Sequence, residues 1–231
     1  VTENVEEAEL SDIVYDLQYD KENALRTSLS FAFKDAEFFP ITDFPSVQGG
    51  RGVFSNFNRR LAISLHEGKM NAPQFGAINM AGTEFIVANT KLKPSPATLN
   101  LKASGNLQNM LALLNHKPLS VFVRVGKDIL PAEGAIDVTA ELAFPMKKNI
   151  ETGDIVYQAK GSIVDFEMPN TEIMSAISGP LVEFSVNPGA LDLTGQFQTL
   201  GVELDGNLVY DIKKQTSRLT ADFEIDRALI N

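Results

Sequence analysis

The sequence alternates apolar and polar residues in short runs along most of its length. The longest run places Ile136, Val138, Ala140, Leu142 and Phe144 at every second position. Side chains two residues apart point to the same face of a β-strand, so such a run forms a strand with one apolar and one polar face. A chain patterned in this way predicts an all-β fold that consists mainly of one-sided antiparallel sheet.

The composition excludes several classes of function. The 231-residue chain has a formal net charge of −10 and 44% hydrophobic residues, which is enough for a core. An acidic chain without a run of Lys or Arg repels phosphate backbones, so we expect no nucleic-acid partner. Cysteine is absent, which excludes a disulfide framework and a thiolate metal site.

The sequence offers little support for catalysis. It contains two histidines, His66 and His116, in unrelated contexts, so acid–base or metal chemistry based on histidine has a weak basis. Residues 66–70 begin like a zinc-protease helix, but Met70 stands where the second histidine is needed. We therefore expect a protein that is not an enzyme and that needs no metal or cofactor.

One segment has a helical rather than a strand period. Its apolar residues fall at positions i, i+3, i+4 and i+7, and they are Leu107, Met110, Leu111 and Leu114. Asn106 is the expected N-cap, and Pro118 is expected to stop the helix. The pattern predicts about two turns of helix here, with strands resuming at residues 121–125.

Two strand cassettes, at about residues 30–105 and 160–225, share an order of landmarks. Leu61 and Ile63 in the first cassette correspond to Leu191 and Leu193 in the second, 130 positions later. Repetition of a strand cassette favours an elongated, extendable sheet over a closed globule. We expect residues 1–231 to form a single elongated segment of a longer protein.

The apolar face has two interpretations that periodicity cannot separate. In a structural or adhesive β-sandwich it packs against a second sheet as a sealed core without a ligand. In a curled sheet it encloses an apolar ligand, as barrels and grooves do for lipids.

The order of glycine, proline and apolar positions resembles the periplasmic AsmA-like protein family, and most of all its YhdP-type subgroup of bridge-like lipid transport proteins. The resembling stretch runs from about residue 31 to residue 169. Its landmarks are residues 31–40 (FAFKDAEFFP), the glycine turn at 49–52, the strand at 61–65, residues 99–105 before the helix, and the long strand from 134 to 145.

The resemblance implies a fold and a function. Such proteins are anchored in the inner membrane of Gram-negative bacteria and cross the periplasm. A folded-over β-sheet forms a groove with a hydrophobic lining, in which the acyl tails of phospholipid lie while the headgroups stay in water. This chain would be one section of the conduit between inner and outer membranes, anchored through a segment outside it.

The expected fold is therefore an all-β, elongated, curled antiparallel sheet that forms a folded-over groove, with one short helix. The expected partner is phospholipid or another acyl lipid. The residues expected to line the groove share the apolar phase of the strands, and they are Leu29, Phe31, Phe33, Ile63, Leu65, Leu101, Val123, Ile136, Val138, Leu142, Leu193, Leu204, Phe223 and Ile225.

Overall fold

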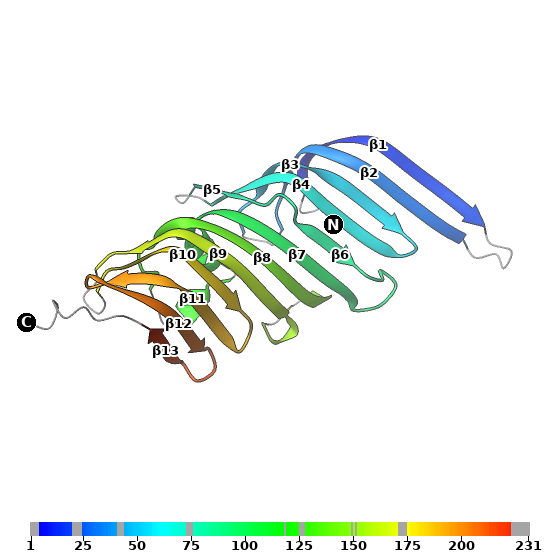
Figure 1. The fold of residues 1–231 in the computed structure, drawn as a ribbon. Coiled ribbons are helices and arrows are strands. Elements are labelled where there is room, and N and C mark those ends of the chain that lie inside the picture. Colours follow the sequence, from blue (N-terminus) through cyan, green and yellow to red (C-terminus); the bar gives the residue numbers. More distant parts are fainter. Residues whose placement is uncertain are drawn as a thin grey trace, which may run out of the picture. The chain divides into compact units, whose positions relative to one another are not determined.

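The structure confirms the all-β fold with antiparallel strands and one short helix. It is a computed structural model that describes residues 5–19, 25–40, 44–72, 76–117, 119–124, 128–148, 150, 152–170 and 175–222. Within these residues, thirteen strands belong to one sheet, and Figure 1 labels them. Their order in the sheet is β1-β2-β3-β4-β5-β7-β8-β9-β10-β11-β12-β13, and β6 pairs with β4 and β7.

The strands are β1 (Val5–Tyr19), β2 (Leu25–Phe38), β3 (Val47–Phe57), β4 (Arg60–Ala72), β5 (Gly76–Asn79), β6 (Glu84–Val87), β7 (Ser95–Asn106), β8 (Glu133–Met146), β9 (Val156–Met168), β10 (Ile177–Val186), β11 (Ala190–Thr199), β12 (Val202–Asp211) and β13 (Thr216–Asp222). The helical segments are α1 (Leu107–Asn115), α2 (Val121–Arg124) and the 3-10 turn η2 (Thr152–Asp154).

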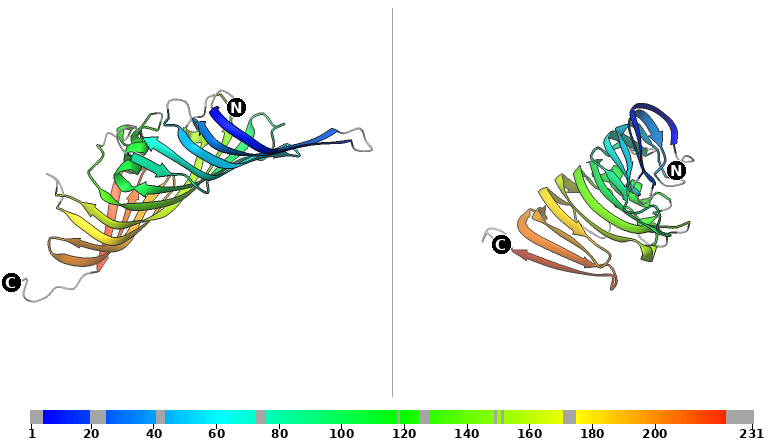
Figure 2. Two further views of the ribbon diagram at one scale, coloured as in Figure 1. Left: turned by 90° about the horizontal axis from the view of Figure 1, so that it is seen from above. Right: turned by 90° about the vertical axis from the view of Figure 1, so that its right-hand side faces the viewer.

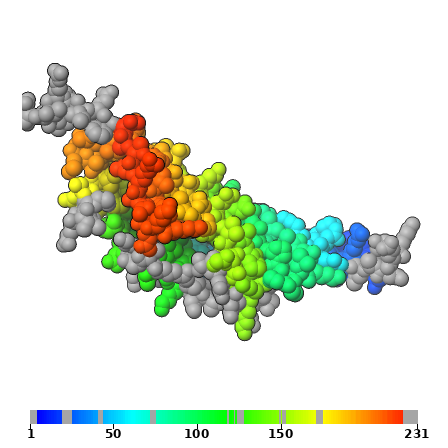
Figure 3. Space-filling view, turned by 90° about the horizontal axis from the view of Figure 1, so that it is seen from below, coloured from blue at the N-terminus to red at the C-terminus, as the bar shows by residue number. Residues whose placement is uncertain are grey.

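The chain divides into two compact units. Unit 1 comprises Val1–Ala103 and Thr139–Tyr157, and unit 2 comprises Ser104–Val138 and Gln158–Asn231. Both views of Figure 2 show the strands of each unit side by side in chain order, for example β1 and β2 in unit 1. In the space-filling view, β12 and β13 of unit 2 likewise lie next to each other, coloured orange and red (Figure 3).

Unit 1 has its most buried side chains near one of the two edges that the ends of its strands form, namely the edge where β3 begins and β4 ends. Val47 at the start of β3 pairs with Met70 near the end of β4, and Met70 pairs with Ile78 on β5. Their exposed fractions are 2%, 2% and 0%. Phe44, which precedes β3, is buried as well. A local apolar core therefore closes this edge of unit 1.

The two cassettes repeat the register of their strands. Phe54 on β3 pairs with Ile63 on β4, and Phe184 on β10 pairs with Leu193 on β11. Each residue of the second pair stands 130 positions after its counterpart. The similarity between the cassettes thus extends from the order of residues to the pairing of strands.

A backbone irregularity repeats at the same interval. Asp35 in β2 and Asp165 in β9 lie 130 positions apart, and both have left-handed backbone conformations, with φ of 51° and 52°. Aspartate tolerates this conformation better than most residues. At Asp35 the β2–β3 register shifts between Phe33 and Ala36, which is the mark of a β-bulge.

Helix α1 of unit 2 begins where the sequence predicts. Asn106 is its N-cap, and its Oδ1 accepts a hydrogen bond of 2.8 Å from the Gln108 backbone N–H, which satisfies one of the free donors of the first turn. The predicted apolar face is wrong by one position at its end. Leu113 is 7% exposed, whereas Leu114 is 37% exposed, because this short helix buries its i, i+3 and i+6 positions.

Residues 121–124 form the helical turn α2 and not the predicted strand. The Val123 backbone N–H donates a 3.1 Å hydrogen bond to Oδ1 of Asn115 at the end of α1. This bond ties the turn to the preceding helix. Strand propensity of the valines was overridden here, since β-propensity acts only where a neighbouring strand is available to pair.

Candidate functional site

An apolar row of side chains crosses five strands of unit 1. The register aligns one residue from each of β2, β3, β4, β6 and β7, and we call these the unit 1 row: Phe31, Phe54, Ile63, Phe85 and Leu99. The rings of Phe31 and Phe54 are stacked, with centroids 4.6 Å apart and planes 10° apart. Every member of the row is half-buried. Each side chain of the row therefore packs against its neighbours on the adjacent strands, and part of its surface remains exposed to solvent.

Strand β8 extends this apolar surface. Phe144, the last apolar residue of the Ile136–Phe144 run, lies with its ring centroid 6.4 Å from that of Phe85. Along β8 the apolar positions are buried or half-buried, and the intervening Asp137, Thr139 and Glu141 are exposed. The predicted alternation is thus present in this strand, which has one apolar and one polar face.

Unit 2 has an equivalent apolar row on strands β9 to β13. Its members are aligned by register in the same way, and we call them the unit 2 row: Gly161, Phe184, Leu193, Leu208 and Leu219. A Cβ on Gly161 would lie 2.8 Å from Cζ of Phe184 and would collide with the backbone oxygen of Asp137. The Phe184 ring therefore occupies the space over Gly161, and that position must stay without a side chain.

The predicted lining residues divide by burial. Eight of them are half-buried, and these are Leu29, Phe31, Ile63, Leu101, Val138, Leu142, Leu193 and Leu204. Phe33, Leu65 and Ile136 are buried, with exposed fractions of 8%, 5% and 6%. The open part of the apolar face is thus a subset of the residues in apolar phase, because some of them lie under neighbouring side chains.

Three predicted lining residues do not belong to the described strand faces. Val123 is on helical turn α2 and is 66% exposed, so its assignment to a strand was wrong. Phe223 and Ile225 lie outside the residues that the structure describes.

Of the two rows, the sequence prediction named Phe31, Ile63 and Leu193 and missed the other members, which are Phe54, Phe85, Leu99, Gly161, Phe184, Leu208 and Leu219. Phe54 follows Val53, and Phe85 precedes Ile86, so adjacent apolar residues hide the strand parity at both places. The register with β2 and β4 decides that the ring of Phe54 faces Phe31 and Ile63. The interval of 130 residues was a usable signal, because it relates Phe54 to Phe184 and Ile63 to Leu193.

The opposite face of unit 2 carries polar side chains. Asn207 Nδ2 donates hydrogen bonds of 2.7 Å to Asp192 Oδ1 and of 2.9 Å to Thr194 Oγ1. These contacts join β11 and β12 on the polar face of the sheet. The face of the unit 2 row is mainly apolar, with Tyr210 and Ser217 two positions from Leu208 and Leu219.

A shallow depression of about 470 Å³ lies on this polar face, lined among others by Glu183, Asp205 and Asp222. Asp205 and Asp222 are register partners on β12 and β13, so their like charges repel. Within the described residues, no group of three or more His, Cys, Asp or Glu side chains could hold a metal ion.

Several titratable side chains whose pKa is shifted pair across neighbouring strands of unit 1. Hydrogen bonds from Ser46 Oγ, at 2.6 Å, and from Gln48 Nε2, at 2.9 Å, lower the pKa of the Glu37 carboxyl. The Arg51 guanidinium lowers the pKa of Glu67 through a hydrogen bond and its charge. The ion pair of Arg51 with Glu67 joins β3 to β4.

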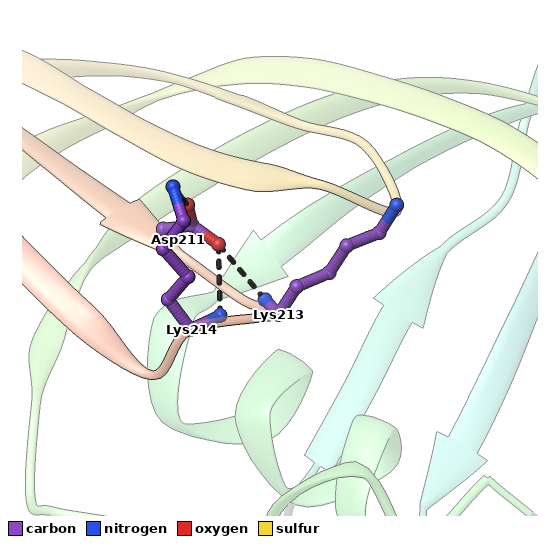
Figure 4. Close-up of polar contacts among 3 residues, drawn as sticks. All are labelled: Asp211, Lys213 and Lys214. Atoms are coloured by element: carbon purple, nitrogen blue, oxygen red, sulfur yellow. Dashed lines mark hydrogen bonds and ion pairs between the residues drawn. The ribbon is translucent and has the colours of Figure 1, made fainter.

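The turn between β12 and β13 is organised by Asp211. Its Oδ1 accepts hydrogen bonds from the backbone N–H groups of Lys214, at 2.9 Å, and Lys213, at 3.1 Å (Figure 4). The Lys214 ammonium also pairs with Oδ2 at 3.1 Å, and together these contacts lower the pKa of Asp211. The Lys213 side chain extends away from the carboxylate (Figure 4).

Among the described residues, no helix has the length and hydrophobicity needed to cross a membrane. Comparison of the chain with protein families, with curated proteins and with solved structures finds no match in any of the three.

Proposed function

We propose that this chain binds acyl lipid on its apolar face and forms one section of a conduit for phospholipid between the inner and outer membranes of a Gram-negative envelope. In this proposal the parent protein works in the periplasm and is anchored in the inner membrane through a segment outside the chain. The resemblance to AsmA-like proteins supplies the location, and the apolar rows supply the contact surface. The mechanism is passive and requires no bond chemistry and no cofactor.

The observation that carries the proposal is that the rows keep solvent-accessible apolar surface: the unit 1 row is half-buried, and in the unit 2 row Phe184, Leu193 and Leu208 are half-buried while Leu219 is 63% exposed. A side chain in the sealed core of a sandwich is covered from above by a second sheet. All strands of the described residues lie in one sheet, and Phe54, Ile63 and Leu193 remain half-buried. Binding of an apolar ligand to such a face is favourable, because the contact removes the remaining apolar area of the face from water.

Acyl chains suit this surface better than a polar or rigid ligand. Phe and Leu side chains offer dispersion contacts but no hydrogen bonds, so they hold an alkyl chain without fixing its position. Each CH₂ group removed from water contributes about 0.8 kcal/mol. Because neighbouring positions along the row give similar contacts, a chain moves between them without breaking a specific bond.

Site-specific photocrosslinking tests the proposal. A photoreactive amino acid is placed at Ile63 in unit 1 or at Leu193 in unit 2, and the neighbours Ser64 and Thr194 on the polar face serve as matched controls. We expect phospholipid adducts from positions 63 and 193 after expression in a Gram-negative host. Adducts of equal yield from positions 64 and 194 contradict the proposal, since they mean that no sided lipid surface exists.

Native mass spectrometry of the purified chain provides an independent measurement. Copurified phospholipid, or binding of added phospholipid, is the expected result. A chain that is free of lipid and takes up none supports the structural or adhesive sandwich instead.

A further inference from the structure

The edge of unit 1 where its hairpins turn carries a cluster of cations. Strands β3 and β4 are joined there by Asn58 and Arg59, strands β6 and β7 by residues 88–94, and strands β8 and β9 by a connection that contains Lys147 and Lys148. Figure 1 shows these three connections on the same side of the strands. Phe85 and Phe144 each stand two residues before the end of their strand, so the contact between their rings places the ends of β6 and β8 near each other.

The described residues of these connections include several exposed cations, which are Arg59, Lys91, Lys93, Lys147 and Lys148. Lys147 is paired with Asp154 at 2.7 Å. For the other four, no carboxylate of the described residues lies within ion-pair distance. We call Arg59, Lys91, Lys93 and Lys148 the basic rim. The β8–β9 connection also contains Glu151 and Asp154, so the positive surplus at this edge comes from Arg59, Lys91 and Lys93.

Hydrogen bonds hold two of these connections together. The backbone N–H of Thr90 donates to the carbonyl oxygen of Arg59 at 2.8 Å, which joins the two turns directly. The Lys91 N–H donates to Asn89 Oδ1 at 3.0 Å, and Ser95 Oγ donates to the Leu92 carbonyl at 2.7 Å. The backbone that presents Arg59, Lys91 and Lys93 is therefore well supported, while their charged ends remain exposed.

The opposite edge of unit 1 has the reverse character. The described residues that connect β2 with β3, and β5 with β6, contain no charged side chain, and Phe44 and Met80 among them are buried. Burial also increases along β4 from the basic rim to this edge, from half-buried Ile63 through Leu65 to Met70. Burial is high at both ends, because Val87 and Ala97 beside the basic rim are each 3% exposed, so the two ends differ in the charge of their connections.

We infer that the basic rim binds the phosphate of a lipid whose acyl chains lie on the unit 1 row, so that the chain prefers anionic phospholipid to neutral acyl lipid. This inference rests on the proposed function. Ile63 is four residues from Arg59, roughly 13 Å along an extended strand. That distance lets a glycerophosphate reach the rim while its chains cover the row. Arg and Lys form charge-assisted hydrogen bonds with phosphate oxygens.

A charge-matched pair of variants tests the inference. The rim variant combines Arg59→Gln, Lys91→Gln and Lys93→Gln. The control variant combines Arg218→Gln, Lys69→Gln and Lys102→Gln, which removes the same residue types from positions in the polar phase of β13, β4 and β7, away from the basic rim. Both variants must show the thermal unfolding of the wild-type chain, so that only surface charge differs.

The measurement is displacement of a fluorescent acyl lipid by dioleoyl phosphatidylglycerol or by dioleoylglycerol, which has the same chains without phosphate. For the wild type and the control variant we expect phosphatidylglycerol to compete about tenfold better, a modest value because the rim is exposed. For the rim variant we expect the two lipids to compete within about twofold of each other, with dioleoylglycerol binding unchanged. Glycerol 3-phosphate, a soluble source of the same chemistry, should compete only at millimolar concentration or above.

The outcomes separate this inference from the function on which it rests. If neither lipid displaces the probe, the proposed function fails and the inference fails with it. If both lipids bind but the wild type shows no preference, or the rim variant keeps it, the inference is wrong and the proposed function stands. Competition by micromolar glycerol 3-phosphate also overturns the inference, since the rim would then serve a soluble phosphate.

Discussion

The ring of Phe33 lies over Gly52, its register partner on the neighbouring strand. A Cβ built on Gly52 would lie 2.7 Å from Cζ of Phe33 and would collide with the backbone oxygen of Ser64. The glycine-rich segment at residues 49–52, which the sequence marks as a turn or a close backbone approach, lies inside strand β3. At Gly52 the reason for glycine is the close approach of a ring and a neighbouring strand.

Gly52→Ala should therefore destabilise the fold. The added methyl group must displace β4 or the Phe33 ring, and overpacking of this kind costs about 1–3 kcal/mol. Gly153→Ala is the matched control, because nothing lies within 4 Å of its Cβ position. Urea unfolding measures both. Equal midpoints for the two variants would show that β3 and β4 are not packed as closely as the structure has them.

The parity of strand β8 can be tested with one pair of substitutions. Val138 is half-buried on the apolar face, and its neighbour Thr139 is exposed. Val138→Asp should lower the free energy of unfolding by about 1–3 kcal/mol, because it places a charge among apolar side chains. Thr139→Asp should change it by about 0.5 kcal/mol or less. Similar losses from both changes would remove the basis for a one-sided sheet.

The observed face of helix α1 makes a different pair informative. Leu113 is buried and Leu114 is exposed, although the helical period of the sequence favoured Leu114. Leu113→Glu should destabilise the protein by about 2–5 kcal/mol, while Leu114→Glu should be tolerated. Thermal unfolding followed by circular dichroism compares them. A larger effect at Leu114 would restore the face predicted from the sequence.

Protonation of Glu37 should contribute to the loss of stability in acid. Hydrogen bonds from Ser46 and Gln48 hold the pKa of Glu37 below its usual value of 4.5 in the folded protein. A lowered pKa means that this stabilisation is complete above the pKa of the unfolded chain and disappears as the pH falls through the folded pKa. The stability lost between pH 7 and about pH 3 should therefore be smaller in Glu37→Gln than in the wild type.

Denaturant titrations at the two pH values measure this difference. Ser46→Ala, which removes a donor and leaves the carboxyl in place, should reduce the loss in the same direction. An identical pH dependence in the wild type and Glu37→Gln would mean that the hydrogen bonds to Glu37 do not persist in solution.

The sequence by itself determined the local features of this protein. Alternation along residues 136–144 is enough for the two faces of β8, because successive side chains of a strand must point to opposite sides. Asn106 is enough for the start of α1, because its side chain reaches a free N–H of the first turn. The interval of 130 residues between Ile63 and Leu193 likewise marks equivalent strands.

Only the tertiary structure decided which residues meet and how deeply they lie. The partner of Phe54 follows from the registers of β2, β3 and β4, which are long-range pairings that no local pattern specifies. Residues in the same phase, such as Ile63 and Leu65, differ in burial because only one of them lies near the closed edge of unit 1. The helical turn at residues 121–124 and the basic rim depend in the same way on contacts and connections between distant segments. The alternation of side chains between the two faces of a strand follows from covalent geometry. Strand pairing, burial and the grouping of charged side chains arise only when distant parts of the chain come together.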